Sequence, residues 1–143
     1  MPPDAPPEAR REASPSVTLE VPPGAEFEPL VRLVLGGVGA RADMALEDLD
    51  DLQLAVERLL AEAASDGRTR LTCDVRPGSV RTRVGPLRAD VIATALQGDE
   101  PPPEELGLRR VLETVVDSFG VEPDADRVDD NVVVVLEKRV RDA

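Results

Sequence analysis

The sequence predicts an α+β fold, a two-layer sandwich in which helices cover one face of a mixed or antiparallel β-sheet. Three observations lead to this prediction. Residues 25–42 and 46–65 each carry apolar side chains at helical spacing. Residues 71–84 read as two short strands joined by a turn, which is typical of a hairpin. Residues 132–136 form a wholly apolar run, which is typical of a buried strand.

The first elements are a strand and a helix. Residues 17–21, VTLEV, alternate apolar and polar side chains and are followed by Pro22 and Pro23, so we expect a strand that ends there. Residues 25–42 then form an apolar stripe at helical spacing. The stripe consists of Phe27, Leu30, Val31, Val34, Leu35 and Val38. Three glycines late in this helix weaken it by about 1 kcal/mol each relative to alanine.

The helix expected over 46–65 has the clearest pattern in the chain. Its first turns are acidic, and negative charge there suits the positive end of the helix dipole. Asp66-Gly67 follows as a turn signal. One side of the helix must be buried because apolar residues recur along it at helical spacing. These residues are Leu49, Leu52, Val56, Leu59, Leu60 and Ala63.

The second half of the chain predicts a hairpin, a loop, a third helix and a last strand. The hairpin strands, 71–75 and 80–84, flank Arg-Pro-Gly-Ser, and residues 89–96 fit either a helical turn or a strand. Three consecutive prolines predict a loop at 97–105. A helix should begin near Glu104 and stop at Phe119-Gly120. The run 132–136 should then lie centrally in the sheet.

Composition limits the kinds of partner and chemistry. The 143 residues suffice for one domain, expected at 16–141, after a Pro-rich tail at 1–15 that should be disordered. A net charge of −12 disfavours nucleic acid and anionic membranes and favours a protein partner. The chain has one cysteine and no histidine, which excludes an ordinary Cys/His zinc site and histidine catalysis. No long apolar span is present, so we expect a cytoplasmic protein.

The phrase LQLAVERLLAEAA resembles the second helix of the anti-sigma-factor serine kinases, which belong to the GHKL, or histidine-kinase-like, ATPase superfamily. The phrase LGLRRVLETVVDSFGVE is similar to the glycine-containing third helix of that family and the strand after it. The order of elements resembles the family over residues 17–139. The resemblance implies a GHKL-type fold that binds ATP and Mg²⁺ between its helices and a flexible lid. Family members hold a sigma factor or phosphorylate a serine on an antagonist protein, and they often form homodimers.

The family carries a glutamate and, four residues later, a magnesium-binding asparagine on the second helix. These places fall on Arg58 and Glu62 here. Arg58 can only donate hydrogen bonds, whereas Glu62 could ligate a cation. Their spacing predicts a surface ion pair, and the alternative is that Arg58 contacts a phosphate. A register shifted by one residue would make Glu57 the catalytic carboxylate and place Ala61 where the asparagine belongs.

The resemblance also implies an adenine-binding Asp-x-Gly-x-Gly turn after the hairpin. The corresponding residues, 84–90, contain Asp90 but no aspartate with glycines at that spacing, so Asp90 reads more simply as a solvated loop residue. Gly98 and Gly107 are what the chain offers in place of the lid glycines. A glycine before a helix is also tolerated for structural reasons, and we favour that interpretation for Gly107.

We therefore consider three functions, of which we favour the first. The first is an anti-sigma-factor-like regulator of transcription that works by protein–protein binding and has a degenerate ATP site. The alternative is an active ATP-dependent serine kinase that uses Glu62 as a metal ligand and phosphorylates an anti-sigma-factor antagonist. The third is an acidic α+β adaptor without nucleotide. The expected partner of the first two is a sigma factor or its antagonist, and ATP with Mg²⁺ is the cofactor that the kinase would need.

Overall fold

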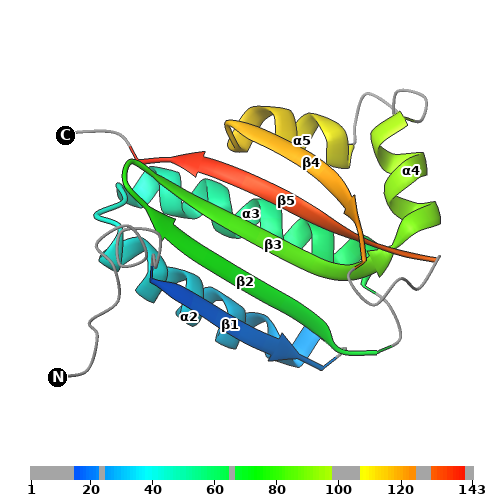
Figure 1. Ribbon diagram of the computed structural model, residues 1–143, viewed down its shortest axis with the longest axis horizontal. Coiled ribbons are helices and arrows are strands. Elements are labelled where there is room, and N and C mark those ends of the chain that lie inside the picture. The colour runs from blue at the N-terminus through cyan, green and yellow to red at the C-terminus, as the bar shows by residue number, and fades with distance from the viewer. Residues whose placement is uncertain (1–14, 23–24, 65–66, 98–106, 125–129, 141–143) are drawn as a thin grey trace, which may run out of the picture.

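The computed structural model describes residues 15–22, 25–64, 67–97, 107–124 and 130–140. Helices lie behind a twisted five-stranded sheet in Figure 1, so the predicted α+β class with helices on one face is confirmed. Every pairing between the described strands is antiparallel, so the sheet is not mixed.

The strands lie in the order β1-β2-β3-β5-β4. Their bounds are Ser16–Val21 for β1, Thr69–Arg76 for β2, Ser79–Arg88 for β3, Ser118–Pro123 for β4 and Asn131–Arg139 for β5. The predicted hairpin is β2–β3, with longer strands than expected. Its turn is Pro77-Gly78, and Gly78 adopts φ 78°, which a residue without a Cβ tolerates best.

The helices are α2 (Glu28–Arg41), α3 (Leu46–Ala63), α4 (Ala89–Gln97) and α5 (Leu108–Val115), with a 3₁₀ turn, η1 (Ala25–Phe27), before α2. The segment that the sequence left open between helix and strand is thus the helix α4. Within the described residues, none of these helices has the length and apolarity needed to cross a lipid bilayer.

Two expected segments fall mainly outside the described residues. Of the expected tail, 1–15, only Pro15 is described, and its carbonyl accepts a hydrogen bond from the amide of Val75 at 2.8 Å. Of the expected loop, 97–105, only Gln97 is described, and it ends α4 rather than beginning a loop.

The predicted end of the third helix is wrong. Helix α5 stops at Val115, and Val116 already has the extended angles φ −122° and ψ 158°. Residues 118–123 form β4, in which Phe119 pairs with Leu136 and Gly120 lies within the strand. Gly120 therefore does not stop a helix. Pairing with β5 satisfies the backbone groups of this segment, and the side chains of Val116, Phe119 and Val121 are of kinds that strands favour.

Strand β5 lies between β3 and β4, so the prediction of an interior strand is confirmed. Val134 and Leu136 are fully buried toward the helices. Val133 and Val135 are half-buried on the opposite face, which the helices leave uncovered. Lys138 continues the helix-facing row and is buried as well.

The core is formed by aliphatic side chains between the sheet and the helices α2, α3, α4 and α5. The predicted stripe of α3 is largely confirmed, since Leu52, Val56, Leu59 and Ala63 have no exposed surface. On α2 the prediction holds for Val31, Leu35 and Val38, which are buried. It is wrong for Leu30, which is 42% exposed.

Candidate nucleotide site

The two positions to which the resemblance would assign catalysis, Arg58 and Glu62, lie on α3, and their side chains contact each other. The Nε of Arg58 donates to Oε2 of Glu62 at 3.0 Å, and both side chains are partly exposed. The ion pair expected from their spacing is therefore present. A partly exposed pair of this kind contributes only about 0.3–0.5 kcal/mol to stability. Its importance lies in what it does to the chemistry of Glu62.

The alternative catalytic carboxylate, Glu57, is held by an arginine from α2. Arg32 donates through Nε to Oε1 at 2.9 Å and through Nη2 to Oε2 at 3.1 Å, in a two-pronged geometry. The carbonyl of Arg32 also accepts a hydrogen bond from Gln53 at 3.0 Å, which fixes α2 against α3. The hydrogen bond and charge of Glu57 raise the pKa of Arg32 above its ordinary value, so the guanidinium stays charged.

Asp90, the candidate adenine-binding residue, lies in the first turn of α4. Its Oδ2 accepts from Nη2 of Arg88 at 3.3 Å, and its side chain is 74% exposed. The residue is thus a solvated helix-start carboxylate rather than a loop residue. Such a position favours negative charge for structural reasons alone.

The glycines that could have served a nucleotide have other surroundings. Gly107 precedes α5 with φ −66° and ψ 156°, an ordinary conformation for any residue. Gly98 lies outside the described residues. Gly85, from the expected adenine-binding stretch, lies at the irregularity between β3 and β5. A Cβ there would lie 2.7 Å from Cγ2 of Val133, so the absent side chain is required by strand packing.

A second polar cluster, which the sequence analysis missed, lies beneath the helices. The ammonium of Lys138 donates to the carbonyl of Val115 at 2.8 Å and to Oδ2 of Asp51 at 3.3 Å. Its nitrogen also lies 3.7 Å from Oδ1 of Asp48, whose side chain is 2% exposed. This cluster joins β5, α5 and the start of α3. The signal in the sequence is the alternation along this strand, which places the chain's single lysine in the same row as Val134 and Leu136.

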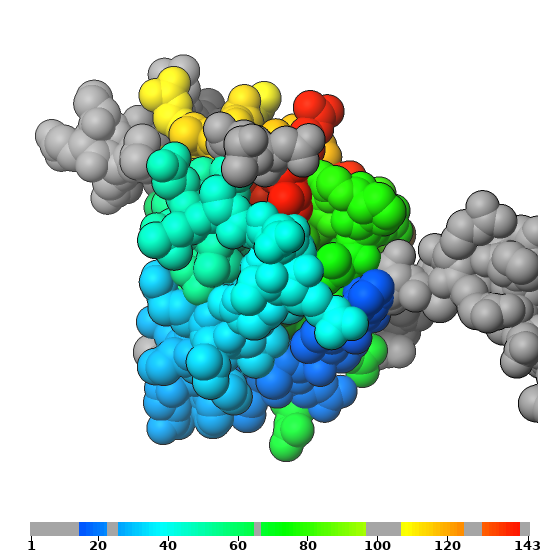
Figure 2. Space-filling model, turned by 90° about the vertical axis from the view of Figure 1, so that its left-hand side faces the viewer, coloured from blue at the N-terminus to red at the C-terminus, as the bar shows by residue number. Residues whose placement is uncertain are grey.

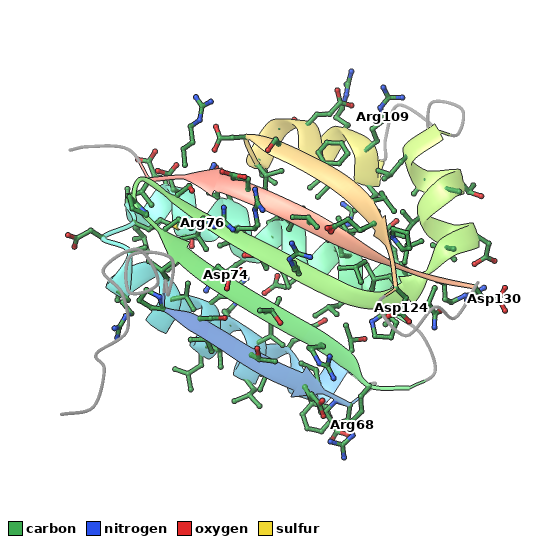
Figure 3. All side chains as sticks on the ribbon, in the orientation of Figure 1. Arg68, Asp74, Arg76, Arg109, Asp124 and Asp130 are labelled. Carbon is green, nitrogen blue, oxygen red and sulfur yellow. The ribbon has the colours of Figure 1, made fainter. Side chains whose placement is uncertain are left out.

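The outer face of the sheet carries a hollow of about 420 Å³. Three arginines and three carboxylates surround it, including Arg68 and Asp124, which Figure 3 labels near the ends of β1 and β4. Cross-strand pairs such as Arg83–Glu122, at 3.1 Å, balance these charges. The described candidate residues (Arg58, Glu62, Glu57, Asp90 and Gly107) do not line this hollow.

The described residues gather no group of three histidine, cysteine, aspartate or glutamate side chains that could hold a metal ion. A search of protein-family models finds none that matches the chain. A search of curated proteins finds no match either. The main feature of the described candidate site is that each candidate carboxylate is paired with an arginine.

Proposed function

We propose that the chain is an anti-sigma-factor-like regulator that acts by binding a protein and does not transfer phosphate. The observation that carries this proposal is the pairing of Glu62 with Arg58 and of Glu57 with Arg32. In either alignment with the anti-sigma-factor kinases, the catalytic helix offers an arginine–carboxylate pair where the family offers a free carboxylate and a metal-binding amide. The fold class is compatible with a degenerate member of that superfamily.

Charge explains why such a pair disfavours catalysis. Magnesium needs oxygen ligands in near-octahedral geometry, and Glu62 is the carboxylate at the family's ligand position. A dication on that carboxylate would lie close to the guanidinium of Arg58, whose Nε is 3.0 Å from Oε2. Repulsion between charges of +2 and +1 at about 4 Å costs about 2 kcal/mol even in water-like surroundings. Phosphoryl transfer depends on metal-held charge neutralisation, which this arrangement opposes.

The charge of the whole chain supports binding to protein. A net charge of −12 suits a partner with a basic face and opposes binding to nucleic acid. The sigma factors and antagonists bound by the anti-sigma-factor family are therefore the partners that we propose to test.

The first experiment titrates the purified protein with ATP and Mg²⁺ by calorimetry and follows its melting temperature. We expect neither heat nor a thermal shift at millimolar nucleotide. A ligand at 100 times its Kd would stabilise the folded state by about 2.7 kcal/mol, which a melting curve detects easily. Complex formation with individual purified sigma factors, measured by size-exclusion chromatography, tests the binding half of the proposal.

The kinase alternative predicts the opposite results. Micromolar ATP binding, abolished by Glu62→Ala, together with labelling of an antagonist protein, would refute a non-catalytic regulator. Glu113→Ala is the matched control, because Glu113 forms a similar exposed i,i+4 pair with Arg109 on α5. If Glu62→Ala and Glu113→Ala behave alike, Glu62 is not a metal ligand.

A further inference from the structure

Four leucines on α2 and α3 expose their side chains to solvent. On α2, Leu30 is 42% and Leu33 is 73% exposed; on α3, Leu46 is 72% and Leu54 is 41% exposed. Single exposed leucines are normal on protein surfaces, and a group of them on two packed helices is a candidate site of protein interaction. These four belong to adjacent helices, so we call them the α2–α3 leucine surface.

The two helices are held side by side along their length. Arg32 on α2 contacts Glu57 and Gln53 on α3, and Gly39 lies against Leu49 near the other end. In Figure 2 the residues of α2 and α3, coloured blue to cyan, form a continuous surface beside β1 and the β2–β3 hairpin.

The exposed leucines share the outward sides of their helices. Leu46 and Leu54 are eight residues apart on α3, with Asp50 between them, so the three lie along one face. Leu30 and Leu33 are three apart on α2 and are neighbours by the same rule. This face of α3 is distinct from the one that carries the buried stripe.

Two glycines on α2 leave room beside these leucines. A Cβ on Gly36 or on Gly37 would have no described atom within 4 Å. Gly39 differs, because a Cβ there would lie 3.0 Å from Leu49. Packing within the described residues therefore accounts for Gly39 but not for the other two. Gly37 is four residues from Leu33 and three from Val34, so the surface left low by this glycine adjoins an exposed leucine.

The segment that carries the leucine surface is acidic. Residues 25–64 contain nine acidic side chains and three arginines, and two of the acidic side chains, Asp48 and Asp51, contact Lys138 instead. Glu28, Asp50 and Glu57 all act on the single guanidinium of Arg32, so the junction between the helices carries an excess of negative charge. A partner for this surface must combine aliphatic side chains with positive charge.

We propose that the α2–α3 leucine surface docks an amphipathic helix of a partner protein, with an aliphatic stripe flanked by lysines and arginines. The proposal rests on the proposed function, a regulator that binds protein, and names the chemistry of its partner. A helix is the occupant because a third helix can lay an apolar stripe along two packed helices, with its i and i+4 ridges set into their grooves. An extended segment would instead need a free sheet edge for its main-chain groups, which α2 and α3 do not offer.

A peptide assay tests this docking with the full-length protein. The probe is a synthetic helix of about 18 residues, or five turns, with leucines on one face, lysines elsewhere and one tryptophan. The protein contains no tryptophan or tyrosine, so the fluorescence of the peptide reports binding without background. We expect saturable binding that weakens with added salt, and much weaker binding of a peptide with glutamates in place of the lysines.

Substitutions in the protein test where the peptide binds. Leu33→Ser with Leu46→Ser should weaken binding of the peptide by about tenfold or more. Val121→Ser is the matched control, because Val121 is 45% exposed on β4 at the far edge of the sheet, and it should leave binding unchanged. Gly36→Ala with Gly37→Ala should raise the melting temperature yet weaken binding, a combination that impaired folding cannot produce.

Three results would overturn the proposal: equal binding by the leucine variant and the wild type, equal binding of the acidic peptide, or loss of binding in Val121→Ser. Sedimentation of the protein alone can give a fourth result that would overturn it. If the leucine substitutions turn a dimer into a monomer, the surface joins two copies of this chain instead. The nucleotide titration and the sigma-factor complex are separate readouts. A sigma-factor complex that survives the leucine substitutions would refute this surface and leave the proposed function standing.

Discussion

Replacing Lys138 by methionine tests the buried polar cluster. The substitution keeps an unbranched chain of similar length but removes the ammonium that contacts Asp51 at 3.3 Å and the carbonyl of Val115 at 2.8 Å. Asp48, 3.7 Å from that nitrogen and 2% exposed, would lose its contact with the ammonium while staying buried. Breaking one side of a buried ion pair is costly because the other charge stays desolvated.

The expected loss is about 3–5 kcal/mol of the free energy of unfolding, the range for removing one partner of a buried pair. For a domain of this size, each kcal/mol lowers the melting temperature by about 2–4 °C, so the melting temperature should fall by about 10 °C. By contrast, Arg58→Met breaks the partly exposed pair on α3 and should cost no more than about 0.5 kcal/mol.

Urea unfolding followed by far-UV circular dichroism measures both variants, since the chain lacks tryptophan and tyrosine for fluorescence. The double variant Asp48→Asn with Lys138→Met should regain at least about 1 kcal/mol over Lys138→Met, because a neutral amide is cheaper to bury than a carboxylate. If Lys138→Met costs less than about 1 kcal/mol, the cluster behaves as an exposed pair and the reasoning is wrong.

Three smaller predictions concern glycines and the buried thiol. Gly37→Ala should stabilise the protein by about 0.5–1 kcal/mol in urea unfolding, because α2 loses a flexible residue and gains no clash; a loss of stability would contradict the open space beside it. Gly85→Ala should destabilise by about 1–3 kcal/mol, because its Cβ would lie 2.7 Å from Val133, and an unchanged unfolding midpoint would show that β5 moves aside freely. Burial raises the pKa of Cys73 to about 11, partly opposed by its hydrogen bond from Thr82. The folded thiol therefore stays protonated while the unfolded one ionises, and stability should fall between about pH 9 and 11, a fall that Cys73→Ala should reduce.

The elements that the sequence predicted well are those whose local pattern agrees with their final packing. Helix α3 has an acidic start and an unbroken apolar stripe, and that stripe packs against the sheet. The β2–β3 hairpin follows from Pro77-Gly78 in the same way. The end of α5 was missed because Val115 and Val116 fit both a helix and a strand. Pairing of Ser118–Pro123 with β5 decides between them, and that pairing joins residues far apart in the sequence.

The same distinction between local pattern and long-range packing applies to the candidate site. The Arg58–Glu62 pair follows from a spacing of four within one helix, so sequence alone could predict it. The Arg32–Glu57 pair joins residues 25 apart on two helices and depends on how α2 packs against α3. Exposure of Leu30 could not be predicted either, because α2 is apolar on several sides and only its packing shows which side the sheet takes.

The polar side of α3 adds little to the stability of the fold, so the loss of catalytic residues that we propose would leave the scaffold intact. The buried stripe of α3 packs against the sheet whatever residues occupy positions 58 and 62. An arginine–glutamate pair there contributes only about 0.3–0.5 kcal/mol, so replacing a glutamate and an asparagine would change the stability of the fold very little. The same replacement removes the amide ligand and adds a positive charge where a metal would bind. A protein altered in this way keeps a folded α2–α3 pair with exposed leucines and excess negative charge. The activity that we propose for that surface is binding, and the substitutions at Leu33 and Leu46 test it directly.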